Sequence, residues 1–240
     1  IDIRNVTLSH NITAEELDRI PKARSFQGIA LVAPGVNAGE VEAGMQVHGA
    51  SGAENSYLVD GVPTNSLIDG RARENTVFEY LQEVQVKTSG INAEYGGALG
   101  GVVSAVTKSG GNRFTGEGHY YYIGNGLSAA PVQRIQLSPV DNQTVFHVQD
   151  QKQQDNRHEL GGSLGGPIVR DRLFFFGSYS PRLVRRTNDY LFSNGLEPDS
   201  ISQKQTLTQA FGKLSYSSGR RVTASANLLA TPQHSRGTLP

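Results

Sequence analysis

Beyond Gly110-Gly111 the chain is dominated by stretches in which apolar or small residues alternate with polar ones. Successive side chains of a β-strand point to opposite faces, so this period of two predicts strands with one apolar and one polar face. The pattern therefore predicts an antiparallel sheet, whose strands we place at residues 113–123, 158–168, 173–179, 206–216 and 221–230.

The connections between these strands alternate in length. Residues 124–156 and 181–205 form long connections, whereas 169–172 and 217–220 form short ones. Because neighbouring strands are antiparallel, all long connections fall at one end of the sheet. This arrangement is typical of an outer-membrane barrel, which has long extracellular loops and short periplasmic turns. A soluble β-sandwich is the alternative that four connections leave open.

Composition excludes several other classes. Lys and Arg together number 22 and balance 22 Asp and Glu, and the basic pairs Arg71/Arg73, Arg185/Arg186 and Arg220/Arg221 are short, so we expect no nucleic-acid partner. Cysteine is absent, which removes disulfides and thiolate sites but leaves the compartment open. No window approaches the ~18 apolar residues of a transmembrane helix, a test that transmembrane strands escape.

Residues 1–111 predict a different, α+β unit. Thr13 and Glu16 form a capping box that opens a helix ending at Pro21, and a second helix is expected over 25–32. Short strands are expected at 46–48, 57–59, 83–87 and 102–108. Asp60-Gly61 is a tight-turn signal.

The sequence gives only weak support for a nucleotide-binding, metal-binding or catalytic site. The glycine cluster 96–101 precedes a β-branched run, whereas a dinucleotide fingerprint follows a strand and opens a helix. The histidines lack metal-ligand spacing, so a metal site would require convergence in the fold. His48, Ser51 and Asp60 are the residue types of a hydrolytic triad but read as turn residues, with no nucleophile elbow. We therefore expect no catalytic, cofactor-binding or metal-binding residues and no enzyme.

A polar stretch over residues 65–76 contains Arg71, Arg73, Glu74 and Asn75. A solvated loop is the default interpretation of such a stretch. A ligand-facing loop is the sharper alternative, because binding residues are often carried on loops.

Three segments together resemble the plug domain of TonB-dependent outer-membrane receptors. They are 55–63, which contains the Val-Asp-Gly-Val-Pro hairpin, the strand 80–87, and 94–108, which contains the Tyr-Gly-Gly and Gly-Gly-Val-Val motifs, and they occur in the family's order. The plug motif residues are Asp60, Gly61, Pro63, Tyr95, Gly96, Gly97, Gly100, Gly101, Thr107 and Lys108. Gly165-Gly166-Pro167 before the strand at 173–179 resembles the Oar-like branch. The family's Arg-Gly pair is replaced by Thr88-Ser89-Gly90.

The resemblance implies a plug over residues 1–111 and the first strands of a barrel over 112–240, within a barrel of about 22 strands. Glu117, His119, Glu159 and Gln209 would supply the polar lumen face. Five strands cannot close such a barrel, so we expect the sequence to be a fragment. The expected location is the outer membrane of a Gram-negative bacterium, with the plug in the lumen and the long loops extracellular.

The implied function is active transport, in which a ligand binds outside and the TonB-ExbB-ExbD complex pulls on a segment upstream of residue 1. The loops at 36–45, 65–75, 124–156 and 181–205 are expected to face the substrate, which the sequence does not identify. Further expected partners are outer-membrane lipid or lipopolysaccharide and a surface lipoprotein or envelope complex. A non-transporting structural or adhesion barrel is the main alternative, and a soluble two-domain enzyme is the second.

Overall fold

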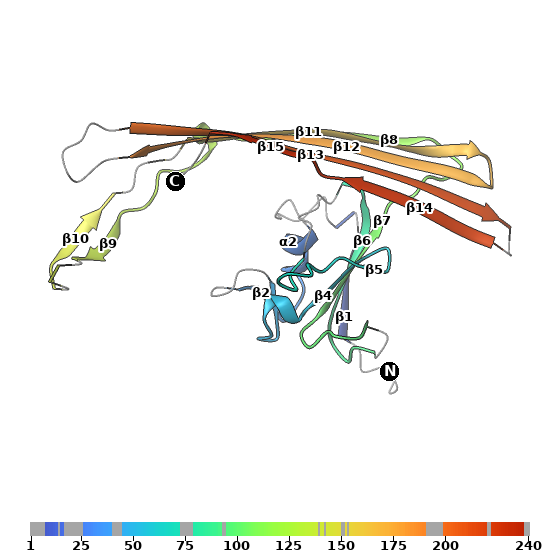
Figure 1. Ribbon diagram of the computed structural model, residues 1–240, viewed down its shortest axis with the longest axis horizontal. Coiled ribbons are helices and arrows are strands. Elements are labelled where there is room, and N and C mark those ends of the chain that lie inside the picture. Colours follow the sequence, from blue (N-terminus) through green and yellow to red (C-terminus); the bar gives the residue numbers. More distant parts are fainter. Residues whose placement is uncertain are drawn as a thin grey trace.

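The computed structural model describes residues 8–13, 15–16, 26–39, 45–72, 79–92, 95–138, 140–141, 143–149, 152, 154–190, 199–219 and 222–237. A sheet of long strands runs the length of the molecule, and a smaller N-terminal unit lies against one of its faces (Figure 1). We call the long sheet the wall sheet. It contains β8 and β11 to β15, and the N-terminal unit contains β1 to β7.

The N-terminal unit is built on a five-stranded sheet in the order β1-β6-β7-β4-β5. The strands are β1 (Leu8–Thr13), β4 (Ser56–Val59), β5 (Val62–Pro63), β6 (Leu81–Ser89) and β7 (Val102–Thr107). β4 and β7 are parallel, and the other pairs are antiparallel. Alternate residues of β6 and β7 are buried, which makes this sheet the centre of the hydrophobic core.

Smaller elements complete the unit. The helix α2 (Phe26–Ala30) contacts β6 and β7, and β2 (Val36–Ala38) pairs with β3 (Met45–Val47). A turn of 3-10 helix, η1 (Gly52–Glu54), precedes β4. The expected strands at 46–48, 57–59, 83–87 and 102–108 correspond to β3, β4, β6 and β7 to within a few residues.

The first residues of the chain differ from expectation. β1 pairs with β6 along its length, although no strand was predicted there. Its sequence mixes polar and apolar residues, and only Ile12 is buried. The predicted capping box is confirmed, because the Thr13 amide donates to Glu16 Oε2 at 3.0 Å and the Glu16 amide donates to Thr13 Oγ1 at 3.4 Å. The expected helix end at Pro21 lies outside the described residues.

The wall sheet has the strand order β14-β13-β12-β11-β8, and β15 also pairs with β13. Its strands are β8 (Thr115–Ile123), β11 (Gln154–Val169), β12 (Leu173–Tyr190), β13 (Asp199–Ser218), β14 (Val222–Ala230) and β15 (Gln233–Arg236). All neighbours are antiparallel. The predicted antiparallel sheet is thus confirmed, as are the tight turns, where Asp171 and Gly219 adopt left-handed backbone angles.

One of the two predicted long loops, 181–205, is largely strand, which corrects the prediction from sequence. β12 continues to Tyr190 and β13 begins at Asp199, so most of 181–205 extends the sheet. Polar residues on both faces hide the period of two in this part, and Pro181 resembled a strand end. The ladder with β11 passes Pro181 by stopping at Glu159↔Arg182 and resuming at Gly162↔Tyr179.

The connection 124–156 also contains structure. It holds a short 3-10 helix, η3 (Asn125–Leu127), and the hairpin of β9 (Arg134–Leu137) and β10 (Val145–Val148), and β11 begins within it. The β9–β10 hairpin lies near one end of the wall sheet, and the tight turns lie at the other end (Figure 1).

The two faces of the wall sheet have different environments. Side chains on the face turned toward the N-terminal unit include buried Phe176, Ser178, Ser180, Gln209 and Phe211. The outer face exposes a band of large apolar and aromatic side chains, namely Tyr120, Leu160, Leu164, Tyr179, Leu183, Leu214 and Leu228. This is the polarity of an outer-membrane barrel strand, which turns its apolar side to lipid. Among the described helices, none is long and apolar enough to cross a membrane.

Candidate functional site

The contact between the N-terminal unit and the wall sheet is centred on Asp60. Its Oδ1 accepts the Thr107 amide at 2.9 Å, and its Oδ2 accepts the Thr107 hydroxyl at 2.6 Å. From the wall, Lys213 Nζ and Asn227 Nδ2 each reach Oδ2 at 3.0 Å. One carboxylate therefore joins the β4–β5 hairpin, β7 and two strands of the wall.

The backbone places this carboxylate. Asp60 and Gly61 have φ angles of 48° and 80°, so both central residues of the two-residue β4–β5 turn are left-handed. This confirms the predicted tight turn and matches a type I′ hairpin, for which Asp-Gly is a favoured pair. The turn projects the carboxylate beyond the end of β4, toward the wall.

The charge of Asp60 is stabilised in this position. Burial alone would raise the pKa of the carboxyl group, but hydrogen bonds from the Thr107 hydroxyl and amide and the Lys213 ammonium outweigh it. The pKa of Asp60 therefore lies below its usual value. Lys213 is itself buried, with 9% of its side chain exposed, and it also donates to Thr107 Oγ1 at 2.7 Å.

Three contacts tie the connection between the units to the wall. Lys108 Nζ pairs with Glu117 Oε2 at 2.8 Å. Gly110 lies so close to the wall that a Cβ there would be 2.1 Å from the Phe175 carbonyl oxygen, so only glycine fits. Next, Asn112 accepts the Asp171 amide at 2.8 Å and donates to its carboxylate at 2.6 Å.

An apolar contact lies beside the polar ones. The ring of Tyr80 stacks on Phe211 with centroids 4.6 Å apart, and Phe176 packs against Phe211 at 6.2 Å. Tyr80 is 1% exposed, and both phenylalanines belong to the same core cluster as the N-terminal unit. The core of the unit therefore extends onto the wall. These phenylalanines were not predicted as contacts, since isolated apolar residues on a polar face give little signal.

A third contact groups charged side chains. His119 Nε2 lies 3.8 Å from Glu79 Oε1, and the ligand atoms of Glu79, His119 and Glu159 lie within 4.8 Å of one another. Glu159 is already paired with Arg182, whose Nε donates to Oε2 at 3.0 Å. The imidazole occupies space left by Gly161, where a Cβ would lie 2.3 Å from His119 Nε2. The Arg182 pair makes this an ion-pair network rather than a ready metal site.

The glycines of the predicted motif accompany a buried asparagine. Asn55 is 2% exposed, donates to the Met45 carbonyl at 2.6 Å and accepts the Gly101 amide at 2.8 Å. A Cβ at Gly100 would lie 2.5 Å from Asn55 Oδ1, and one at Gly101 would lie 2.7 Å from a methyl of Val47. Both glycines are therefore required by close approach.

The remaining residues of the predicted plug motif are Pro63, Gly96, Gly97 and Tyr95. Pro63 is exposed and pairs with Leu58 across the hairpin, and Gly97 has a φ of 86° in a turn with Gly96. Tyr95 accepts a hydrogen bond from Lys87 Nζ at 2.6 Å, and the ammonium also lies 4.0 Å from the ring centroid.

The substrate-facing candidates are only partly described. Arg71 lies at the end of a turn closed by the Ser66 amide donating to the Arg71 carbonyl at 2.7 Å, and its own amide donates to Asp69 Oδ1 at 3.2 Å. Asn65 holds this turn to β4 by accepting the Tyr57 amide at 3.0 Å. Arg73, Glu74 and Asn75 lie outside the described residues, so the grouping of the four stays a prediction.

The predicted lumen face is where expected. Glu117, His119, Glu159 and Gln209 all lie on the face turned to the N-terminal unit, where the first three form the ion pairs above. Further along the same face, Asp155 Oδ2 lies between Arg157 and Arg186, 3.9 and 3.6 Å from their nitrogens. Arg182 and Arg186 were missed because they fell in a presumed loop.

Two family models divide the chain. One described as "TonB-dependent Receptor Plug Domain" matches residues 2–102, and one described as "Outer membrane beta barrel domain" matches 106–205. The TonB-dependent transporter Oar of Myxococcus xanthus is 34% identical over 194 residues, which is 77% of this chain and 17% of that protein.

Solved structures share the fold. The outer membrane transporter YddB of Escherichia coli matches 93% of this chain with a TM-score of 0.73 and 18% identity. The siderophore receptor PirA of Acinetobacter baumannii matches 95% with a TM-score of 0.63 and 19% identity. In both cases the chain spans 32% of the solved chain, so it corresponds to about a third of such proteins.

Proposed function

Because the chain belongs to the TonB-dependent receptors of the bacterial outer membrane, we propose that it forms the plug and the first barrel strands of an active importer. The plug is residues 1–111, and residues 112–240 begin the barrel. The ligand binds from outside, and the TonB-ExbB-ExbD complex pulls on a segment upstream of the plug to open a path through the lumen.

The observation that carries this proposal is the character of the plug–wall contact. Asp60, Lys213 and Asn227 join the two parts through hydrogen bonds to one carboxylate, and Glu79–His119 adds a second polar contact. Each hydrogen bond to a charged group contributes only about 1.5–3 kcal/mol, because water replaces the partner when the contact opens. A plug that must move and return is suited to such contacts.

The substrate-facing surface is proposed to include Arg71, Arg73, Glu74 and Asn75. It also includes the loops at 36–45 and 124–156 and the part of 181–205 that lies beyond the sheet. Enzymatic activity is not part of the proposal. The carboxylate of Asp60, the only acid of the triad considered from sequence, is committed to Thr107, Lys213 and Asn227. The extracellular partner proposed for the loops is a surface lipoprotein.

Thiol labelling tests import against a passive barrel. These 240 residues contain no cysteine, so Phe211→Cys places a single reporter thiol in this part of the full receptor, beneath the plug; any cysteine elsewhere in the receptor is first replaced by serine. We expect a membrane-impermeant maleimide to label it several-fold faster in cells with working TonB, grown in rich medium, than in cells lacking TonB. Val132→Cys, which is 87% exposed in the long-loop region, should be labelled equally in both. Equal labelling of Phe211→Cys in the two strains would favour the structural or adhesion barrel.

A further inference from the structure

Three basic side chains stand in one row on the outer face of the wall sheet. Arg185 of β12 lies opposite Lys204 of β13, which in turn lies opposite Arg236 of β15. All three are exposed. Side chains directly opposite each other on adjacent strands have Cβ atoms about 4.5–5.5 Å apart, and like charges in such positions destabilise the sheet. The row therefore carries a cost that a bound anion would remove.

No acidic side chain neutralises the row. Within the described ranges, none of the three makes an ion pair, and Arg236 Nε donates only to the imidazole of His234, at 3.3 Å. The acids at a similar height, Asp155 and Glu159, lie on the opposite face and pair there with lumenal arginines. The outer face thus presents uncompensated positive charge at this level.

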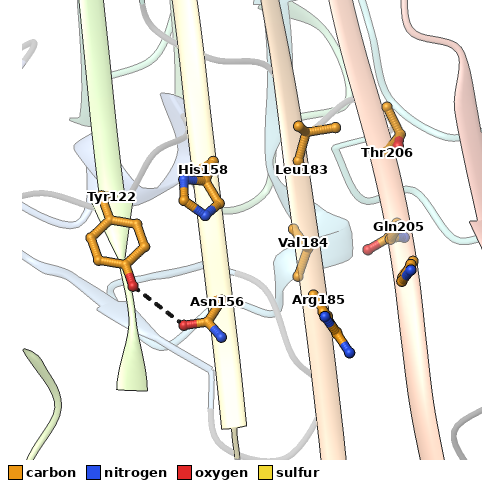
Figure 2. A pocket seen from close by; sticks show the side chains of 9 residues that line it. Tyr122, Asn156, His158, Leu183, Val184, Arg185, Gln205 and Thr206 are labelled. Atoms are coloured by element: carbon orange, nitrogen blue, oxygen red, sulfur yellow. Dashed lines mark hydrogen bonds between the residues drawn. The ribbon is translucent and has the colours of Figure 1, made fainter. Parts of the chain in front are cut away.

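The next row toward the tight turns contains two aromatic rings, one leucine and one threonine. Tyr122, His158, Leu183 and Thr206 stand side by side across four strands, with Asn156 and Arg185 below them in Figure 2. The rings of Tyr122 and His158 are 4.8 Å apart. Arg185 and Lys204 of the basic row and all four residues of this second row line a shallow hollow of about 470 Å³, which Arg236 does not line. Its lining is apolar on one side and cationic on the other, which matches an amphiphile with an anionic head.

The height of the row fits the same occupant. Arg185 is twelve residues along β12 from Leu173, the first residue after the tight turn. At ~3.3 Å per residue and a tilt of ~40°, this distance corresponds to a rise of roughly 30 Å. The apolar band of an outer-membrane barrel is about 25 Å tall and is flanked by aromatic girdles. The row therefore lies just beyond the band, on the long-loop side, at the level of the headgroups of the outer leaflet.

We propose that Arg185, Lys204 and Arg236 bind the phosphate groups of a phosphorylated lipid of the outer leaflet, with an acyl chain lying along the hollow over Leu183. Guanidinium groups suit this role because their planar donors match phosphate oxygens two at a time. The inference rests on the outer-membrane location of the barrel and not on transport.

Native mass spectrometry of the full receptor in detergent tests this site. The probes are purified bis-phosphorylated lipid A and the same lipid after dephosphorylation. We expect the wild type to bind the phosphorylated form, and R185Q/K204Q/R236Q to lose roughly 100-fold in affinity, from about 1 kcal/mol per basic residue at a membrane surface. R185K/R236K, which keeps the charges but loses the planar donors, should bind more weakly than wild type and more tightly than the triple variant.

The control is R186Q, one residue away on β12 but facing the lumen, which should bind within about twofold of wild type. A triple variant that binds as tightly as wild type would overturn the proposal, as would equal binding of the dephosphorylated lipid. Inorganic phosphate at millimolar concentration should not displace the lipid. Displacement would assign the row to a soluble anion instead.

Discussion

Replacing Lys213 by methionine should loosen the N-terminal unit from the wall without unfolding the barrel. The methionine keeps most of the side-chain volume but removes the 3.0 Å ion pair with Asp60 and the 2.7 Å bond to Thr107 Oγ1. Asp60 keeps its Thr107 and Asn227 donors, so its charge is not left isolated. Hydrogen bonds to charged groups contribute about 1.5–3 kcal/mol each, and we expect a net loss of about 2 kcal/mol.

Hydrogen exchange of the full receptor measures this loss where it occurs. Because each 1.36 kcal/mol corresponds to a factor of ten, a loss of about 2 kcal/mol should speed exchange of the slowest amides of β7 by about 30-fold. The Thr107 amide, which donates to Asp60 at 2.9 Å, is the best single reporter. Amides of β11, which lies two strands away from β13 in the wall sheet, should change little.

The double-mutant cycle supplies the control. Asp60→Asn keeps a residue that tolerates the left-handed φ of 48° and can still accept the Thr107 amide. The double variant should lose about 1–2 kcal/mol less stability than the sum of the two single variants, because each single change already removes the same ion pair. Unchanged exchange in Lys213→Met, or strict additivity in the cycle, would refute the view that this pair holds the unit to the wall.

Three further outcomes are expected. Gly161→Ala places a Cβ 2.3 Å from His119 Nε2 and should lower the free energy of unfolding by about 1–3 kcal/mol in urea titration. The control, Gly212→Ala, has open space around it and should lower the free energy of unfolding by well under half as much. Asn55→Ala leaves the buried Gly101 amide and Met45 carbonyl without the asparagine partner and should lower the free energy of unfolding by about 2–4 kcal/mol in the same titration. A loss below about 1 kcal/mol would contradict the bridging role of Asn55. Because the pKa of Asp60 is depressed, its contribution is present above the unfolded value of about 3.9 and is lost as pH falls through the lower folded value. The protection of β7 amides, measured against their intrinsic exchange rates at the same pH, should therefore fall below about pH 4 in wild type but not in Asp60→Asn.

The N-terminal unit was predictable where its turn chemistry is local. Asp60-Gly61 specifies a left-handed two-residue turn by itself, and the structure has that turn. The Thr13–Glu16 capping box is likewise a contact within one turn of chain. β1 could not be found in the same way, because its pairing with β6 joins residues seventy or more positions apart and its own sequence carries only a weak pattern.

The wall sheet was predictable where one face meets lipid. Alternation is clear in β8 and β14, but it fades beyond Pro181, where lipid no longer selects apolar side chains and both faces become polar. Strand length in this region is set by the ladder between β12 and β13, which continues to Tyr190↔Asp199. The lumenal partners of the site were hidden for the same reason. Lys213 and Arg182 show no special signal until the fold brings Asp60 and Glu159 opposite them.

Cross-linking in native outer membranes tests most directly that the N-terminal unit lies against the inner face of the wall. In the full receptor, Tyr80→Cys paired with Phe211→Cys should be joined by a short bis-maleimide in most molecules, because the two rings stack at 4.6 Å. Tyr80→Cys paired with Leu214→Cys should not be joined, since Leu214 is 49% exposed on the outer face. Cross-linking of the Leu214 pair, or none of the Phe211 pair, would contradict the account.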